Sequence, residues 1–324
     1  MEGKRVAVTG AGGFIGSHLA ERLVEMGAQV RAFTHYNALG ARGWLDRSDK
    51  AGAMEIVAGD LADSGSVAQL VEGCDVVFHL GALIAIPYSY VAPISYVRTN
   101  IEGTINVLNA ARATGAKVIH TSTSEVYGTA QTVPIGEDHP LQGQSPYSAT
   151  KIGADKLAES YHASFGLPVV TVRPFNTFGP RQLARAVIPT IISQAAATGR
   201  VKLGALSPTR DLNYVANTVE GFVAAALSEA AVGETVNLGS GREISIGDLA
   251  ALIGERMGVA LEIESDEQRL RPDKSEVFRL LADNAKAERL LDWRPDVSLE
   301  EGLDRTIDWV RANLDAFRVG EYTV

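Results

Sequence analysis

The sequence predicts an α/β fold in which a doubly wound parallel sheet is followed by a smaller α/β lobe. Short apolar segments alternate with segments of helical periodicity over roughly the first 174 residues, which is typical of a parallel sheet with helices on both faces. A glycine-rich turn follows the first apolar segment, and beyond residue 175 the alternation becomes irregular. We therefore expect one domain at 1–174, joined by a return segment at about 210–238, and a lobe formed mainly by 175–324.

Composition and charge limit the possible partners. Of 324 residues, 46% are hydrophobic and 21% are charged, and the formal net charge is −9. Without a basic run, nucleic acid or an anionic membrane is not expected as a partner. No apolar run is long enough to span a bilayer, and a strand beginning near Lys4 leaves no room for a signal peptide. With Cys74 as the single cysteine, no internal disulfide is possible. We expect a cytoplasmic protein without a metal site.

The first strand and its turn predict a dinucleotide site. Arg5–Thr9 is apolar and ends at glycines spaced G-x-x-G-x-x-G, and a helical pattern then continues to Met26. Such glycines let the backbone approach a pyrophosphate, which binds at the helix N-terminus. A glycine turn without function is the alternative, and the flanking strand and helix argue against it. The residues predicted here are Gly10, Gly13, Phe14, Ile15 and Gly16.

The end of the second strand, Gln29–Thr34, concerns the choice of dinucleotide. An acidic residue that binds the ribose hydroxyls is expected there, but the position falls on Thr34, followed by His35. Nothing at this position repels a 2′-phosphate, and Arg31 and His35 could favour one. NAD and NADP therefore both remain possible. The segment 36–50 is predicted to be an irregular loop beside the cofactor.

Asp60 follows the third predicted strand, Met54–Ala58. Its carboxylate either binds the adenine amino group or caps the next helix, and the sequence does not distinguish the two roles. The elements predicted after it are a strand at 75–80, a helix at 91–114 that contains Asn100, and a strand at 116–121.

Two polar constellations follow. Ser122–Gly128 lies directly after the fifth strand, where parallel sheets present their chemistry, although a hydrogen-bonded turn is the alternative. Pro146 suits the first position of a helix ending near Phe165, on which Tyr147 and Lys151 share a face. The lysine is expected to lower the pKa of Tyr147, which would then take a proton from a sugar or alcohol hydroxyl while a nicotinamide takes the hydride.

The C-terminal half offers candidate anion contacts. A strand at 167–173 leads into a loop at 174–181 that is rich in polar residues and rigid turns, and an amphipathic helix is predicted at 299–314. Each arginine taken singly is more often a solvated surface residue. The candidates are Arg185, Arg210, Arg269 and Arg271.

The glycine turn, Thr123, the Tyr147-x-x-x-Lys151 pair and the segment Arg173–Asn176 together resemble the extended short-chain dehydrogenase/reductase family. Members have a Rossmann-type domain and act on nucleotide sugars, and the resemblance covers essentially the whole chain. It implies that Thr123, Tyr147 and Lys151 form the catalytic triad. The further dinucleotide contacts that it implies are Asp60, Leu61, Leu80, Ala82, Asn100 and Pro174. The substrate contacts that it implies are Asn176, Arg185, Arg210, Asn237 and Arg271, with the arginines on the diphosphate.

The residues after Thr123 bear on the reaction. Hexose 4,6-dehydratases usually carry Thr-Asp-Glu, whereas this chain has Thr123-Ser124-Glu125. UDP-glucuronate decarboxylases also carry Thr-Ser-Glu, and simple 4-epimerases lack the glutamate. The chain most resembles the nucleotide N-acetylglucosamine 4,6-dehydratases of the legionaminic-acid route, through segments 36–46, 184–189 and Glu321–Val324.

The resemblance therefore implies a nucleotide-sugar 4,6-dehydratase with tightly bound NAD, NADP not being excluded. Glu125 would remove the C5 proton, and Ser124, a water molecule or Glu125 itself would assist the departing C6 hydroxyl. The alternatives are a UDP-glucuronate decarboxylase, a nucleotide-sugar 4-epimerase and a dinucleotide-sensing regulator without catalysis. The nucleotide base and the sugar stay open. A homodimer is expected, paired through apolar positions on two helices: Ile101, Ile105, Leu108, Leu157 and Tyr161.

Overall fold

The computed structural model describes residues 1–317 and 319 and confirms the predicted Rossmann-type α/β fold. A seven-stranded, all-parallel sheet has the order β10-β6-β5-β4-β1-β2-β3. Its strands are β1 (Arg5–Thr9), β2 (Gln29–His35), β3 (Met54–Gly59), β4 (Val76–His79), β5 (Lys117–Thr121), β6 (Val169–Pro174) and β10 (Thr235–Leu238).

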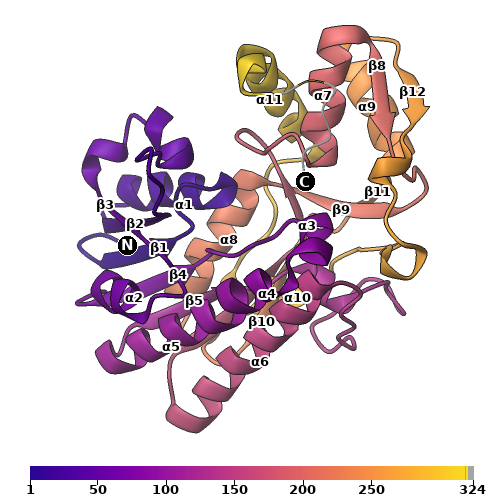
Figure 1. The fold of residues 1–324 in the computed structure, drawn as a ribbon. Coiled ribbons are helices and arrows are strands. Elements are labelled where there is room, and N and C mark those ends of the chain that lie inside the picture. Colours follow the sequence, from indigo (N-terminus) through magenta and orange to yellow (C-terminus); the bar gives the residue numbers. More distant parts are fainter. Residues whose placement is uncertain (318, 320–324) are drawn as a thin grey trace.

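Helices cover both faces of this sheet because its strands are apolar on both sides. Val6 and Val8 of β1 pack toward α1 (Phe14–Glu25) and α8 (Val215–Leu227). Ala7, between them, packs toward the opposite layer. In Figure 1 the first pair of helices lies above the sheet and the second layer below it. The helices of that second layer are α2 (Ser64–Val71), α5 (Gly103–Thr114) and α6 (Pro146–Phe165).

The segment predicted as one helix at 91–114 is divided in the structure. It begins earlier, as α3 (Ile86–Val91), and restarts at Pro93, whose ring nitrogen cannot donate a helical hydrogen bond. A π-helical stretch, Val97–Glu102, then leads into α5 and contains Asn100. Such π turns are often found at functional sites. The elements of this region are α3 (Ile86–Val91), α4 (Pro93–Tyr96) and η3 (Val97–Glu102).

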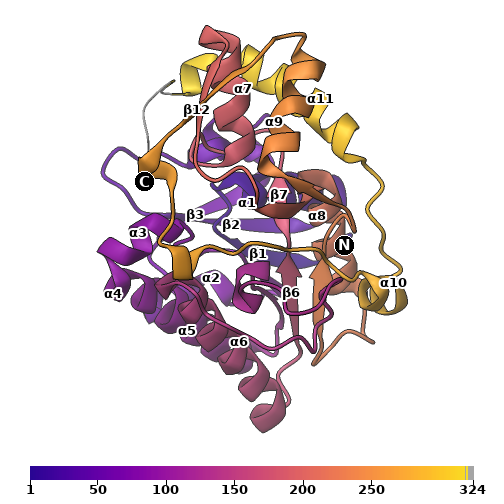
Figure 2. The same cartoon turned by 90° about the vertical axis from the view of Figure 1, so that its right-hand side faces the viewer.

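A smaller lobe lies above the carboxyl edge of the sheet (Figures 1 and 2). It holds a three-stranded sheet of order β11-β9-β7 and a two-stranded sheet of β12 and β8. Its strands are β7 (Asn176–Phe178), β8 (Arg200–Leu203), β9 (Thr209–Tyr214), β11 (Glu243–Ser245) and β12 (Glu262–Ser265). Its helices are α7 (Val187–Thr198), α9 (Ile246–Met257) and α11 (Leu299–Ala312), while α10 (Ala285–Leu291) packs against α8 and β10 of the larger domain.

The connection between the two parts differs in detail from the prediction. Within the segment predicted to return at 210–238, β9 pairs with β7 and β11 of the small lobe. Only α8 and β10 join the large sheet. Among the described residues, no helix is both long and apolar enough to cross a membrane. Glu321–Val324, used in the sequence comparison, lies outside the described residues.

Candidate active site

The glycine turn between β1 and α1 has the backbone geometry of an anion cradle. Gly10 has a φ of 69°, and a Cβ there would lie 2.9 Å from the backbone of Gly81. A Cβ on Gly16 would overlap the Gly10 carbonyl oxygen. Gly13 is the N-cap of α1, no side chain caps this end, and its first turn holds no acid. The N–H groups at Phe14 and Ile15 are therefore available to an anion such as a pyrophosphate.

The segment predicted as an irregular loop at 36–50 is partly ordered and covers this turn. It contains a 3₁₀ helix, Gly43–Arg47, and the Trp44 N–H donates to the Gly12 carbonyl at 2.9 Å. The Trp44 ring packs edge-on against Trp309 of α11, with centroids 5.3 Å apart. The small lobe therefore helps to hold the chain over the glycine turn.

The side chains predicted to contact the adenosine ribose of the dinucleotide lie in different environments. Thr34 is buried and His35 is exposed. Arg31 is occupied: its Nε donates to Glu55 at 2.7 Å and its Nη1 to the Glu72 carbonyl at 2.6 Å. The suggestion that Arg31 favours a 2′-phosphate is therefore not supported, because these contacts hold the guanidinium beside β3 and the end of α2.

The other predicted dinucleotide contacts surround the same edge of the sheet. Asp63, and not Asp60, caps α2, so the capping alternative for Asp60 is wrong. The Asp60 carboxylate instead accepts from the Ala62 N–H at 2.9 Å. Asn100 is buried, and its amide binds both backbone groups of Leu83. It therefore fixes the loop after β4. Leu80 and Ala82 lie at the start of that loop. Leu61 follows Asp60 after β3.

Helix α6 carries Tyr147 and Lys151 on a buried face, as predicted. Ser145 is its N-cap and forms a capping box with Ser148, and Pro146 occupies the first turn. Burial raises the pKa of Tyr147, and a hydrogen bond from the Thr123 hydroxyl only partly opposes this. The expected net lowering of the Tyr147 pKa is therefore not found in the protein alone, because burial outweighs it.

Lys151 points to the end of β5. Its ammonium donates to the Thr121 carbonyl at 2.5 Å. Burial lowers its pKa to about 8, while the Asp155 carboxylate acts in the opposite direction. Asp155 accepts hydrogen bonds from Ser122 and Arg173, so it joins α6 to the ends of β5 and β6.

The predicted cluster after β5 is both a turn and a set of reactive groups. Thr123 caps the 3₁₀ helix Ser124–Tyr127, its hydroxyl accepting from the Glu125 N–H at 3.2 Å. Ser124 and Glu125 are buried. The Glu125 carboxylate lies 3.9 Å from Nη1 of Arg271, and its charge opposes ionisation of Tyr147. Thr123, Glu125 and Tyr147 therefore belong to one site.

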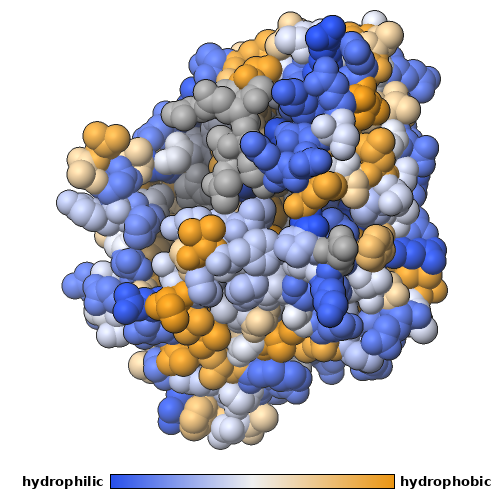
Figure 3. All heavy atoms as spheres, turned by 45° about the vertical axis from the view of Figure 1, so that its right-hand side comes forward, coloured by the Kyte–Doolittle hydropathy of each residue, from blue (hydrophilic) through white to orange (hydrophobic). Residues whose placement is uncertain are grey.

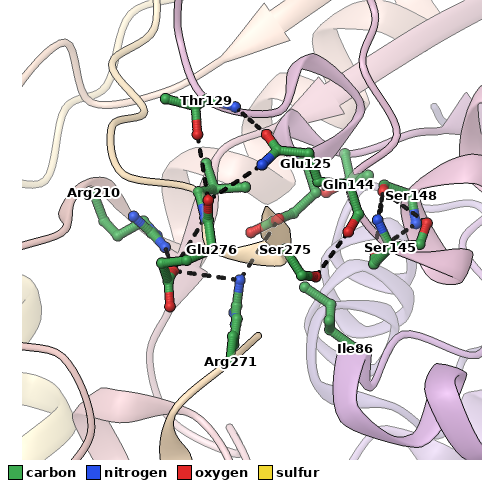
Figure 4. Close-up of polar contacts among 12 residues, drawn as sticks. Ile86, Glu125, Thr129, Gln144, Ser145, Ser148, Arg210, Arg271, Ser275 and Glu276 are labelled. Atoms are coloured by element: carbon green, nitrogen blue, oxygen red, sulfur yellow. Dashed lines mark hydrogen bonds and ion pairs between the residues drawn. The ribbon is translucent and has the colours of Figure 1, made fainter. Parts of the chain in front are cut away.

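A cavity of about 530 Å³ is lined by α3 and by the small lobe, and it meets this site at Arg271, whose Nη1 lies 3.9 Å from Glu125. Asn176 and Gln182 each contribute a buried amide oxygen that has no hydrogen-bond partner among the described residues. Nη1 of Arg271 is likewise buried without such a partner, 3.9 Å from the carboxylates of Glu125 and Glu276 (Figure 4). The lining includes the predicted residues Asn176, Arg185, Arg210, Arg269 and Arg271.

The arginines of the cavity differ in their pairing. Arg210 donates to Glu276 at 3.2 Å, and burial lowers its pKa, against the opposing effect of Glu125 and Glu276. Arg269 pairs with Asp266 at 3.0 Å. Among the described residues, Arg185 has no acidic partner within ion-pair distance. The cavity thus holds positive charge, as binding of a diphosphate requires.

Asn237, predicted to contact the substrate, is not brought to the cavity. It is fully buried in β10, where its amide donates to the Ile135 carbonyl and accepts from the Tyr127 hydroxyl. Pro174 is buried at the end of β6. A second cavity, of about 560 Å³, lies between α6 and β10. Its cations are paired with acids, as in Lys286–Glu234, so it offers no evident ligand chemistry.

Sequence reasoning missed Gln182 and Glu276. Gln182 lies directly after the polar loop predicted at 174–181, and its amide donates to the Thr177 carbonyl at 2.9 Å. Glu276 is close in sequence to Arg271, which was the available signal, but its pairing with Arg210 depends on the tertiary fold.

Comparison with known proteins places this geometry in context. A family model described as GDP-mannose 4,6 dehydratase matches residues 7–306. A UDP-glucose 4-epimerase from Mycolicibacterium smegmatis is 34% identical, over 95% of this chain and 98% of its own. A UDP-N-acetyl-alpha-D-glucosaminuronate decarboxylase from Bacillus cytotoxicus is 36% identical, over 95% and 98%. A double mutant of a dTDP-glucose 4,6-dehydratase from Streptomyces venezuelae, solved with NAD bound, superposes with a TM-score of 0.87 at 29% identity, covering 97% and 98%.

Proposed function

The chain belongs to the GDP-mannose 4,6-dehydratase family, and from that premise we propose that it is a nucleotide-sugar 4,6-dehydratase. Its relatives include epimerases, dehydratases and decarboxylases of nucleotide sugars, so the residues must distinguish the reactions. One observation carries the proposal. The buried Glu125 carboxylate shares a site with Tyr147 and Thr123, and simple 4-epimerases lack this glutamate.

The cofactor is NAD, which is bound in solved relatives. The fit rests on the cradle at Gly10, Gly13 and Gly16, whose shape depends on missing Cβ atoms, and on the uncapped N-terminus of α1. Residues 1–174, with α8 and β10, would bind it. When bound, its nicotinamide supplies the acceptor for hydride from C4 and the donor for its return to C6. We expect it to stay bound through turnover, because the same hydride is returned.

The proton steps fall to side chains around Tyr147. Its phenolate would take the proton of the sugar 4-hydroxyl and become the neutral phenol, with Thr123 hydrogen-bonded at the same place. The buried ammonium of Lys151 favours the phenolate that must be present before this step. Burial raises the pKa of Tyr147 in the protein alone. Tyr147 can therefore act as a base only once the positive charge of the bound cofactor lowers this pKa again.

Glu125 supplies the second proton step. A ketone at C4 acidifies the C5 hydrogen, which the Glu125 carboxylate would remove while the C6 hydroxyl leaves as water, its proton supplied by Ser124, a water molecule or the protonated Glu125. Ser124 stands where hexose 4,6-dehydratases usually carry an aspartic acid, and it is buried. Nη1 of Arg271 lies 3.9 Å from the Glu125 carboxylate, within ion-pair distance.

The substrate would span the cavity with its diphosphate on Arg210 and Arg271 and its sugar toward Tyr147. The unpartnered amide oxygens of Asn176 and Gln182 suit hydroxyl or N–H donors of the ligand. We propose an N-acetylglucosamine or glucose nucleotide. The finer assignment, to the legionaminic-acid route, rests on the sequence resemblance.

A nucleotide uronate decarboxylase is the second candidate, because such enzymes also carry Thr-Ser-Glu and one is 36% identical to this chain. One experiment separates the reactions: incubate the protein with UDP-, GDP-, CDP- and dTDP-sugars, uronates included, and weigh the products. Loss of water from a neutral sugar supports the dehydratase. Loss of carbon dioxide from a uronate supports the decarboxylase. Conversion at unchanged mass identifies an epimerase.

A further inference from the structure

One side chain of the catalytic domain holds the segment that carries two charged residues of the cavity. We name Arg271–Phe278 the arginine strap, because it contains Arg271 and Glu276. Figure 2 shows this orange part of the chain passing from the small lobe across the front of the molecule toward α10. Gln144 meets it with Nε2, which donates to the carbonyls of Lys274 at 3.1 Å and Glu276 at 3.2 Å.

The other atoms of Gln144 complete the connection. Its Oε1 accepts from the Thr129 N–H at 2.5 Å, so both ends of the amide are used. Its carbonyl accepts from the Ser275 hydroxyl at 2.7 Å. The Tyr90 hydroxyl of α3 lies 2.5 Å from the same Ser275 oxygen. Gln144 therefore contacts the strap through both its side chain and its backbone (Figure 4).

The position of Gln144 in the chain gives these contacts a consequence. It directly precedes Ser145, the N-cap of α6, and Tyr147 follows within the first turn. At the other end of the connection, Arg271 and Arg210 both meet the Glu276 carboxylate. Gln144 thus links the segment that carries Arg271 to the start of the catalytic helix.

We propose that Gln144 is a positioning residue that locks the arginine strap onto the start of α6 and thereby sets the affinity of the cavity for the diphosphate of the substrate. The lock itself follows from the hydrogen bonds above, whereas its effect on the diphosphate rests on the proposed function. The lock acts on binding and leaves the proton-transfer groups in place, so it should change KM far more than kcat.

The test exchanges one amide for a carboxylate. Gln144→Glu keeps the shape and the acceptor for Thr129, but it sets a charged oxygen against the carbonyls of Lys274 and Glu276. The Lys274 carbonyl loses the donor that Gln144 provides, and the Glu276 carbonyl keeps only the Thr129 hydroxyl at 3.4 Å. Gln142→Glu makes the same charge change two residues earlier, on an exposed side chain. Amide hydrogen exchange of the strap, measured without ligand, shows how firmly Gln144 holds it. Titration calorimetry with UDP, GDP and dTDP measures the affinity of the cavity for a nucleoside diphosphate.

We expect strap amides to exchange roughly 10-fold faster in Gln144→Glu. The nucleoside diphosphate that binds the wild type should bind Gln144→Glu roughly 10-fold more weakly. Gln142→Glu should match the wild type in strap exchange and in affinity. Unchanged strap exchange overturns the lock, and faster exchange with unchanged affinity overturns its effect on binding. If no nucleoside diphosphate binds the wild type, the proposed function fails together with that effect, while exchange still decides the lock. If Gln144→Glu does not fold, Ser275→Ala, which removes only one bond to Gln144, replaces it with the same readouts.

Discussion

The ammonium of Lys151 donates to the carbonyl of Thr121 at 2.5 Å, although Tyr147 lies one helical turn before it on the same face. The lysine is thereby tied to the end of β5, directly before Ser122 and Thr123. Burial raises the pKa of Tyr147 and lowers that of Lys151 to about 8. In the protein alone, burial therefore disfavours the charged forms of both side chains.

The first prediction concerns the titration of Lys151. Its pKa in the folded protein, about 8, is below the ordinary 10.5, so it loses its charge as pH rises through about 8. A step that needs the ammonium should decline above that pH, giving kcat/KM an alkaline limb there. The unfolded chain binds more protons between these values, so this group makes the fold more stable as pH rises from about 8 to 10.5.

The measurement is the pH profile of kcat/KM, together with NMR titration of isotopically methylated lysine. Asp155→Asn removes the carboxylate that raises this pKa and should move the limb to lower pH. Asp155→Glu, which keeps the charge, is the control. An alkaline limb that stays in place in Asp155→Asn would show that another group titrates.

The second prediction concerns the glycine turn. A Cβ at Gly16 would overlap the Gly10 carbonyl oxygen, so Gly16→Ala should force the turn and α1 apart. We expect a loss of roughly 1–3 kcal/mol in the free energy of unfolding and loss of the dinucleotide that copurifies with the wild type. Gly52→Ala is the matched control, because nothing lies within 4 Å of its added carbon. Denaturant unfolding and assay of released NAD give both values, and Gly16→Ala with normal NAD content would remove the turn from the site.

Much of the fold could be predicted because it depends on local sequence patterns. The glycine turn, the parallel strands and the helix that begins at Pro146 all depend on residues near one another in sequence. The errors lie where distant segments meet. The Arg31 guanidinium is held by Glu55 on the neighbouring strand, and the amide oxygen of Asn237 accepts a hydrogen bond from Tyr127. No spacing rule along the chain encodes such contacts.

The site divides in the same way. The Tyr147–Lys151 pair lies on one helix, so the sequence could place it. That Glu125 meets Arg271 and that Glu276 joins two arginines depend on how the strap crosses the cavity. The direction of the Lys151 side chain also escaped prediction, because the Thr121 carbonyl competes for it only after β5 and α6 have packed.

The third prediction is a homodimer formed through α6 and the helical segment at 91–114, which comprises α4, η3 and α5. Leu108, expected to help, is fully buried in the core and is not available. The exposed apolar side chains lie earlier, with Ile94 64% and Val97 43% exposed. In Figure 3, orange side chains gather in the lower half of this face, where these helices lie. Burying them against a second copy would remove apolar surface from water.

Sedimentation at micromolar concentration should therefore give about twice the chain mass of 34.4 kDa. Ile94→Asp should shift the protein toward monomer, because it would place a charge in the contact. Leu39→Asp is the matched control, since Leu39 is 93% exposed in the segment over the glycine turn. A wild type that sediments as a 34.4 kDa species at this concentration contradicts the dimer.

The last prediction separates the two proton steps. Glu125→Gln keeps the size of the side chain and removes the base, so elimination of water should slow by roughly 10²–10⁴-fold. Oxidation at C4 depends on Tyr147 and Thr123, and it should survive. The variant should therefore accumulate the absorbance of reduced nicotinamide on adding substrate, form little 4-keto-6-deoxy product, and no longer introduce solvent deuterium at C5.

Tyr147→Phe is the companion variant, because it removes the hydroxyl needed for the first step and should show no reduced nicotinamide at all. Glu276→Gln controls for a general loss of charge in the cavity, since Glu276 also lies 3.9 Å from Arg271 but has no proton-transfer role in the mechanism. It should weaken binding and leave deuterium exchange at C5 intact once substrate is saturating. If Glu125→Gln forms the keto product at the wild-type rate, another group removes the C5 proton, because the variant side chain cannot accept it.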